Sequence, residues 1–427
     1  MNNVQVVIVG GGWSGCAAAL AAAKAGAEVT LLERTDMILG TGLVGGIMRN
    51  NGRFTATEEM IAMGAGELFE VCDQTARHKN IHFPGHQHAS LYDIAKTPIE
   101  VEKVLKEKGV TIVYESRVAD ITMTGKVVTA VKDKKGREFK GNVFIDATGT
   151  AGPMANCNRY GNGCGMCVLR CPSFGGRVSL TGLAGVEEKT GKKKDGSVGA
   201  MSGSCKLYKE SLSEEVQQKL NDEGVAVLPV PDTLIEDHLD QKACQQYALE
   251  EFKDNLILLD TGHAKLMTPF YELAKLRQVP GCENARYEDP YSGGKGNSMR
   301  YFNMAPRDNA LKVSGVENLL CCGEKAGLLV GHTEAIVTGV LAGHNAVRCT
   351  LGLNLVEIPS QLAIGDAISY VNEVMQTEEG MGKKYTFSGS VYFERMKEKN
   401  LYTIDVKEIE EKVEQAELKG IFNTRLV

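Results

Sequence analysis

Tryptophan, aromatic side chains and long apolar runs are scarce in this sequence. The 427 residues include a single tryptophan, Trp13, and aromatic residues make up 6% of the chain. No run of about 18 apolar residues occurs, so we expect no membrane-spanning helix. The N-terminus also lacks the basic and apolar regions that mark a secretory signal. We therefore expect a cytoplasmic protein that does not contact a membrane.

A basic field is missing as well. The net charge is −6, and the lysines and arginines are scattered along the chain. Nucleic-acid-binding proteins usually carry a basic patch interleaved with stacking aromatic residues. Both properties weigh against a nucleic-acid substrate, so we expect a small-molecule substrate or a redox partner protein. The 43% of hydrophobic residues provide for a sizeable core.

Glycine is abundant, and one glycine motif near the N-terminus is informative. Residues 4–9 form a β-branched apolar run of strand length, and residues 10–15 (GGGWSG) fit the pattern G-x-G-x-x-G. An alanine-rich helix is predicted over 16–24, followed by a second strand that ends at Glu33. This order of strand, glycines, helix, strand and acid is typical of a dinucleotide site.

Each part of the motif has a physical role. Gly10 permits the tight turn, Gly12 lets the backbone approach a pyrophosphate, and Gly15 lets the helix pack on the strand. The helix N-terminus offers free N–H groups and a positive dipole end to the phosphates. Glu33 can accept the ribose hydroxyls of an adenosine, and its charge disfavours a 2′-phosphate.

Two later segments resemble those of the glutathione-reductase-like FAD flavoproteins. Strand patterns over 110–146 end in the sequence DATG, and an apolar strand near 320 leads into GEKAG and a small-residue helix. The resemblance implies an extended FAD, with the strand near Val118 contacting the adenine and a loop over 35–47 passing close to the flavin ring. The cofactor-binding residues predicted in this way are Gly10, Gly12, Trp13, Ser14, Gly15, Glu33, Arg34, Gly42, Val118, Thr148, Gly149, Gly323, Glu324 and Gly331.

The expected fold class is α/β, with a Rossmann-like FAD-binding domain that an inserted domain interrupts. The FAD-binding domain is predicted to comprise residues 1–150 and 305–360. A mixed α/β cap domain fills 151–304, with helices expected near 213–221, 232–255 and 262–276. A helical tail over 361–427 is expected to pack on the cap or on a second subunit.

Four of the eight histidines cluster in one short stretch, at His78, His82, His86 and His88. The first two could share a helix face, but Pro84 and Gly85 break any helix before the second pair, so the spacing does not support one zinc face. The stretch is either structural or lines the substrate side of the flavin. In the second case His86 and His88 are candidate catalytic groups that donate protons or bind an anion.

A second cluster contains four of the twelve cysteines within CNRYGNGCGMCVLRCP, residues 157–172. Cys164, Cys167 and Cys171 before a proline match the end of the ferredoxin run, and Cys157 would supply a fourth thiolate for a [4Fe–4S] cluster. Alternatively, Cys171 is a redox-active or nucleophilic thiol, or the site is a structural zinc or a set of buried thiols. The other eight cysteines are expected to be buried small apolar residues.

The same cysteine motif also resembles a segment of the folate- and FAD-dependent tRNA uridine methyltransferases. By motif, Cys171 would be that family's catalytic thiol beside the flavin. The C-terminal sequence GEKAGLLVGHTEAIVTG is similar to the flavin-binding end of the same family. Three departures stand against it: an arginine precedes Cys171, the motif has two extra cysteines, and a cysteine-containing stretch after the first βαβ unit is missing.

The middle of the chain looks instead like FAD-dependent oxidoreductases related to the fumarate reductase and heterodisulfide reductase flavoproteins. We therefore expect an FAD-dependent oxidoreductase in which the cysteine motif relays electrons or exchanges thiols. The alternative is a tRNA uridine methyltransferase-like enzyme that uses reduced flavin, a folate carbon donor and Cys171.

Overall fold

The computed structural model describes residues 3–149, 173–193, 195–201, 204–237, 239, 247–268, 271–288 and 299–427. Its centre is a five-stranded parallel sheet in the order β19-β10-β1-β2-β6. This sheet confirms the predicted α/β, Rossmann-type class. Its strands are β1 (Gln5–Val9), β2 (Glu28–Leu32), β6 (Thr111–Val113), β10 (Val143–Asp146) and β19 (Leu319–Cys321).

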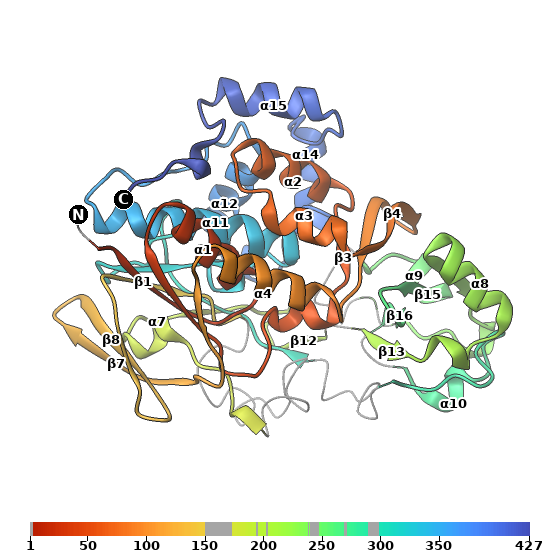
Figure 1. The fold of residues 1–427 in the computed structure, drawn as a ribbon. Coiled ribbons are helices and arrows are strands. Elements are labelled where there is room, and N and C mark those ends of the chain that lie inside the picture. Colours follow the sequence, from red (N-terminus) through yellow and green to blue (C-terminus); the bar gives the residue numbers. More distant parts are fainter. Residues whose placement is uncertain are drawn as a thin grey trace.

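Two helices cross closely on one side of the sheet, α1 (Trp13–Lys24) and α11 (His332–Thr350). They lie side by side in Figure 1 because both present small residues at the crossing. A side chain at Gly339 or Gly343 would collide with the α1 backbone at Ser14 or Ala18. Helix α11 is thereby held against the helix that follows the N-terminal glycine motif.

Two antiparallel units adjoin the parallel sheet. One is the meander of β7 (Val118–Thr124), β8 (Val127–Asp133) and β9 (Glu138–Lys140), and the other is a three-stranded sheet in the order β3-β5-β4. The elements of the second unit and the helices around it are β3 (Ile47–Met48), α2 (Gly52–Ala62), α3 (Glu67–Gln74), β4 (Ala76–Phe83), β5 (His86–Tyr92) and α4 (Thr97–Glu107).

The inserted part contains an antiparallel sheet with its own apolar core, at the right of Figure 1. The strand order is β13-β16-β15-β14, and α8 (Glu214–Glu223) begins after the Ser213 N-cap as the sequence predicts. The other elements of this part are β13 (Cys205–Leu207), β14 (Val225–Pro229), α9 (Glu251–Asp254), β15 (Asn255–Asp260), β16 (Ala264–Leu266) and α10 (Leu273–Leu276).

The prediction of a helix over 262–276 is wrong at its start, where strand β16 forms instead. In the described part of 232–255, the helical segments are η4 (Asp232–Leu234) and α9 (Glu251–Asp254). Residues 255–260 and 264–266 form a hairpin, and Gly262 has φ 106° in the turn between its strands. The run NLILLD has strand length and is almost wholly buried, which an apolar pattern cannot distinguish from a buried helix.

A polar cluster and a small apolar core join this inserted sheet to the β4–β5 hairpin. The carboxylate of Asp260 is fully buried and accepts hydrogen bonds from Arg77, His78 and Lys209 at 2.9–3.0 Å. Burial would raise the pKa of Asp260, but the bonds from Lys209, His78 and Arg77 lower it. The hairpin is therefore fixed to the cap by charge as well as by packing.

The tail is largely helical, and its helix α15 (Val406–Gln415) lies at the top of Figure 1, beside α2. Buried Ile409 and Val413 provide the apolar side of α15. No helix in the described ranges is long and apolar enough to cross a membrane. The remaining elements are η1 (Gly40–Val44), α7 (Leu180–Leu183), β11 (Lys189–Thr190), β12 (Ala200–Met201), η3 (Lys209–Ser211), η4 (Asp232–Leu234), β17 (Met299–Arg300), β18 (Asn303–Met304), η8 (Gly323–Lys325), α12 (Ala363–Val374), α13 (Glu378–Met381), α14 (Ser390–Glu398), α15 (Val406–Gln415) and η9 (Ile421–Asn423).

Candidate dinucleotide site

The glycine turn between β1 and α1 is closed by direct backbone contacts. Gly10 has φ 107°, and a Cβ atom there would collide with the carbonyl oxygen of Ala147. A Cβ atom on Gly15 would collide with the carbonyl oxygen of Gly10. Only glycine fits at these two positions, because one lets β10 approach the turn and the other seats α1 on β1.

Gly12 differs from both of these glycines. A Cβ atom at Gly12 would meet no atom of the described residues within 4 Å, so these residues leave this side of the turn open. Gly12 is also the N-cap of α1, and no described side chain caps that helix end. The first N–H groups of α1 therefore point toward open space, where the helix dipole favours an anion. This is the position at which a pyrophosphate would bind.

Glu33 lies beside the turn and is held by the backbone. Its two carboxylate oxygens accept hydrogen bonds from the amides of Gly11 and Thr35, each at 2.8 Å, and the residue is 7% exposed. Each carboxylate oxygen can accept a second hydrogen bond, so a fixed Glu33 can still receive ribose hydroxyls. The next residue, Arg34, donates from Nη1 to the carbonyl of Gly175 at 2.5 Å.

The loop after β2 packs against the same turn. The amide of Leu39 donates to the carbonyl of Gly11 at 2.7 Å, and Gly42 lies directly against the indole of Trp13. The hydroxyl of Tyr92, at the end of β5, donates to the carbonyl of Gly42 at 3.0 Å and lies 3.4 Å from Trp13 Nε1. Trp13 is thus a buried wall beneath the loop, at 3% exposure.

The end of β10 brings further predicted residues to the turn. Asp146 is fully buried, and one of its oxygens accepts hydrogen bonds from the amide and the hydroxyl of Thr148. Its other oxygen accepts from the amide and the hydroxyl of Thr181, both at 2.8 Å. Gly149 follows with φ 76°. Asp146 therefore fixes the Thr148–Gly149 turn next to Gly10.

The C-terminal segment reaches the site at Ser14. A side chain at Gly323 would collide with the Ser14 side chain, and the Gly323 amide donates to Thr338 Oγ1 at 2.9 Å. Glu324 is half-buried in the same short helix. The segments predicted to enclose the cofactor from the two ends of the chain are therefore adjacent in space.

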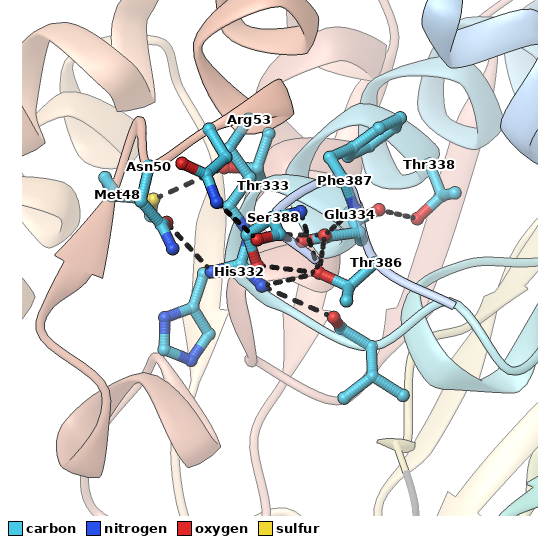
Figure 2. A network of polar contacts seen from close by, with 12 residues as sticks. Met48, Asn50, Arg53, His332, Thr333, Glu334, Thr338, Thr386, Phe387 and Ser388 are labelled. Carbon is cyan, nitrogen blue, oxygen red and sulfur yellow. Dashed lines mark hydrogen bonds and ion pairs between the residues drawn. The ribbon is translucent and has the colours of Figure 1, made fainter. Parts of the chain in front are cut away.

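The N-terminus of α11 is fixed by the buried ion pair shown in Figure 2. The guanidinium of Arg53 lies 3.1 Å from the carboxylate of Glu334, and their side chains are 4% and 0% exposed. Glu334 also accepts hydrogen bonds from the Thr386 hydroxyl at 2.7 Å and the Phe387 amide at 2.8 Å. Gly331, with φ 148°, leaves the space that this pair occupies.

Val118 begins β7 on the side of Glu33. It is 1% exposed, and two residues earlier the Ser116 amide donates to the carbonyl of Glu33 at 2.9 Å. The structure therefore places Val118 near the expected adenosine end, and the other predicted cofactor residues surround the same turn. Their binding of FAD stays a prediction.

His86 and His88 lie at the opposite end of β5 from Tyr92. Six residues of a strand span about 20 Å, so β5 does not bring His86 to the glycine turn. His78 and His82 lie on the strand β4, so the helix face that they could have shared does not form. His86 and His88 remain candidate catalytic groups only for a ligand bound at their own end of the strand.

The cysteine motif over 157–172, with Cys157, Cys164, Cys167 and Cys171, lies outside the described residues. Among the residues that are described, no group of three or more histidine, cysteine or acidic side chains could hold a metal ion. The iron–sulfur cluster stays a prediction. Of the dispersed cysteines, Cys16, Cys72, Cys205, Cys282, Cys321 and Cys322 are buried as expected, Cys349 is half-buried, and Cys244 is outside the described ranges.

Three residues of the site were not predicted from the sequence. Tyr92 and His332 pack with Trp13, and the Tyr92 hydroxyl lies 3.4 Å from His332 Nδ1. Arg53 fixes the α11 N-terminus through Glu334. No local motif marks these residues, because their partners are 79 to 281 positions away in the sequence.

Solved structures of low sequence identity share this fold. Aquifex aeolicus GidA in its form II crystal matches with a TM-score of 0.71 and 16% identity, over 98% of this chain and 74% of that chain. The form I crystal of the same protein gives a TM-score of 0.64 and 15% identity, over 97% of this chain and 79% of that chain.

Two curated relatives match shorter parts of the sequence. The tRNA uridine 5-carboxymethylaminomethyl modification enzyme MnmG of Alkaliphilus metalliredigens (strain QYMF) is 27% identical over 153 residues, 35% of this chain and 24% of that protein. The methylenetetrahydrofolate–tRNA-(uracil-5-)-methyltransferase TrmFO of Prochlorococcus marinus (strain MIT 9303) is 40% identical over 63 residues, 15% of this chain and 13% of that protein. The matches thus span less than a quarter of either relative.

A family model covers most of the chain. The model described as glucose inhibited division protein A matches residues 5–265 and 250–354, which include the glycine turn, Glu33, the inserted part and the whole of α11. The chain therefore belongs to the glucose inhibited division protein A family.

Proposed function

We propose that this protein is an FAD-dependent enzyme that modifies C5 of a uridine in tRNA. Both curated relatives are described by their names as acting on tRNA at position 5 of uridine or uracil. The family membership supports this function over that of a plain oxidoreductase, which the residue patterns alone favour. Since the matches cover only parts of those relatives, the activity itself is what has to be tested.

The observation that carries the proposal is the open face of the glycine turn at Gly12. An open N–H end on α1 and a fixed carboxylate at Glu33 are the two groups that an adenosine diphosphate moiety needs. The residues present therefore fit FAD. Gly12 and the first turn of α1 would hold the pyrophosphate, Glu33 the ribose, and the segment around Gly323 the ribityl chain.

The contacts described above also indicate which residues would surround the flavin ring. Loop 35–47, Trp13 and Tyr92 form one wall, and the N-terminus of α11 forms another. When bound, a flavin supplies two-electron chemistry that can be released in single-electron steps. The protein's own groups orient the ring and exclude water, and the positive end of α11 favours negative charge next to Gly331.

The inserted sheet extends a lysine toward this region. Lys265, at 5% exposure, donates from Nζ to the carbonyl of Val44 in the loop after β2 at 2.5 Å. His263, two residues earlier, has its pKa lowered to about 3 by burial and by the nearby lysines Lys206 and Lys265. The Lys265 ammonium also donates to Ser204 Oγ at 2.8 Å, so this lysine fixes the loop after β2 to the inserted sheet.

We propose Cys171 as the nucleophile on the basis of its sequence motif alone. A thiolate that adds to C6 of a uracil ring would make C5 nucleophilic. After C5 has bonded to the incoming carbon, loss of the C5 proton to a base would break the C6–S bond and release the Cys171 thiolate. The alternative function is an oxidoreductase with a [4Fe–4S] relay, and the four cysteines over 157–172 are the observation that favours it.

One experiment separates the two functions. The purified, FAD-loaded protein is incubated with unmodified tRNA, a reductant and methylenetetrahydrofolate or a glycine and folate mixture, and the digested nucleosides are analysed by mass spectrometry. We expect a new 5-substituted uridine that is lost in Cys171→Ser. An unchanged tRNA, together with about four irons per chain in anaerobically purified protein, would favour the oxidoreductase.

A further inference from the structure

A cavity of about 550 Å³ lies away from the glycine turn, between the β4–β5 hairpin and the tail. This volume is within the usual range for small-ligand sites. Three parts of the chain form its walls: the segment before α2, the hairpin, and the tail from α14 to Tyr402. The lining residues are Asn51, His82, Phe83, Gly85, His86, Gln87, Phe393 and Tyr402.

Rings dominate this lining. His86 stacks on Phe83 with ring centroids 4.6 Å apart, and Phe393 packs edge-on against Tyr402 at 5.0 Å. His82 packs edge-on against His88 at 5.7 Å, and burial and His82 lower the pKa of His88. No lysine, arginine, aspartate or glutamate is among the described lining residues. The walls therefore favour a flat, uncharged ligand.

Hydrogen-bonding groups are also available at the rim. Within the described ranges, the side chains of His82 and Gln87 and the hydroxyl of Tyr402 form no hydrogen bond to another protein group. Burial raises the pKa of Tyr402, so its hydroxyl stays protonated and can donate. A ligand edge with donors and acceptors would match these three groups.

The floor of the cavity is rigid. The side-chain amide of Asn51 donates to the carbonyls of Gly85 and Ser388 at 2.9 and 2.8 Å, and its oxygen accepts from the Gln87 amide at 2.9 Å. These bonds join all three walls and hold Asn51 at φ 54° and ψ −131°, a conformation that non-glycine residues rarely adopt. Such backbone strain is concentrated at functional sites in proteins.

His86 connects this floor to the α11 N-terminus. Asn50 Oδ1 accepts a hydrogen bond from Arg53, which has only donors, so Asn50 must present its Nδ2 donor to His86 Nδ1 at 2.9 Å. A neutral His86 therefore carries its proton on Nε2. Since Arg53 pairs with Glu334, the cavity and the expected flavin site share one buried polar network.

We propose that this cavity is a second binding site, which takes a neutral planar heteroaromatic ring of the size of a nucleoside base. The ring stacks among the aromatic side chains, and its polar edge meets His82, Gln87 and the Tyr402 hydroxyl. The site is separate from the dinucleotide site, and it does not depend on the function proposed above. The base belongs either to a free nucleoside or to an unpaired nucleotide of an RNA strand.

Ligand binding to the FAD-loaded protein tests this proposal, because FAD then fills the site at the glycine turn. Saturation-transfer NMR and calorimetry would use uridine, adenosine, 5,6-dihydrouridine and a five-residue oligouridylate. Dihydrouridine keeps the polar edge of uridine but loses its planar ring. We expect uridine or adenosine to bind and dihydrouridine to bind about fivefold more weakly or worse, because stacking supplies much of the affinity.

Three variants locate the binding. Tyr402→Leu and His82→Ala should each weaken nucleoside binding about fivefold or more, while FAD content and melting temperature stay unchanged. Tyr208→Leu, on the cap and 47% exposed, is the matched control and should bind as the parent does. Tighter, Tyr402-dependent binding of the oligouridylate would identify an RNA strand as the source of the base.

The proposal is overturned by either of two results. One is that no nucleoside and no oligouridylate binds at millimolar concentration. The other is that binding persists in a Tyr402→Leu, His82→Ala double variant. Neither result bears on tRNA modification, which is read from the products of the reaction and not from this cavity.

Discussion

The glycine turn and the Arg53–Glu334 network are neighbours built in opposite ways. The turn is local in sequence and leaves polar groups open, namely the first amides of α1 above Gly12. The network joins residues from α2, α11 and the tail, and it pairs its charges completely. The comparison indicates that the open polar groups receive a ligand, whereas the paired ones fix the walls around it.

The largest expected effect comes from breaking the buried pair. Arg53→Met leaves the Glu334 carboxylate buried without its cation, which should cost about 3–5 kcal/mol of unfolding free energy. Denaturant unfolding followed by circular dichroism measures this loss. Arg53→Met combined with Glu334→Gln should recover part of it, because a neutral amide still accepts hydrogen bonds. A single variant as stable as the parent would contradict the structural role of the pair.

The next effect concerns the buried imidazole of His344, which packs edge-on against Phe422. Among described groups, neither ring nitrogen of His344 forms a hydrogen bond, and burial, followed by the charge of Arg348, lowers its pKa to about 4. The unfolded chain, with an ordinary histidine pKa, binds the proton first as the pH falls. The native state should therefore lose stability from about pH 6.5 down to pH 4.

The variant His344→Leu measures how much stability the imidazole costs at low pH. Between pH 7 and pH 5, His344 should account for about 2 kcal/mol of lost stability, since each pKa unit corresponds to about 1.36 kcal/mol. His344→Leu removes this contribution, so its unfolding free energy should depend less steeply on pH over that range. Parallel pH profiles for the parent and the variant would show that the imidazole is not buried as described.

The smallest effect is expected on the surface. The Lys103–Glu100 pair has side chains 59% and 42% exposed, and such pairs contribute little. Lys103→Met should change the unfolding free energy by less than about 0.5 kcal/mol. This variant is the charge-removal control for Arg53→Met, and a loss as large as that of Arg53→Met would indicate a general effect of charge.

The sequence was sufficient to predict those parts of the site whose residues follow one another closely in the chain. The strand, glycines, helix and Glu33 follow one another within thirty residues or so, and the structure brings Gly10, Gly12, Ser14 and Glu33 together. The sequence was insufficient to predict contacts between residues that lie far apart in the chain. Tyr92 reaches Trp13 and Gly42 only because β5 passes the turn, and no periodicity indicates that.

In the inserted part, the sequence did not distinguish strands from helices. Residues 255–266 are apolar enough to be a buried helix or a pair of strands, and pairing with β13 and β14 decides for strands. The histidine stretch was similarly ambiguous, and its residues form the wall of a separate cavity some 20 Å along β5 from Tyr92. Tertiary pairing decides such segments, and a single sequence does not contain it.

FAD binding at the open face of Gly12 is the central claim, and Gly12→Ala tests it most directly. Among the described residues, no atom lies within 4 Å of the added methyl group, so the variant should fold normally but obstruct the pyrophosphate. Gly382→Ala, where the nearest atom would be 3.4 Å away, is the matched control. In a titration followed by flavin fluorescence, we predict one FAD per chain for the parent and for Gly382→Ala, and about tenfold or more weaker binding for Gly12→Ala. Parent protein that takes up no FAD, or a Gly12→Ala variant that binds it as tightly as the parent, would contradict the account.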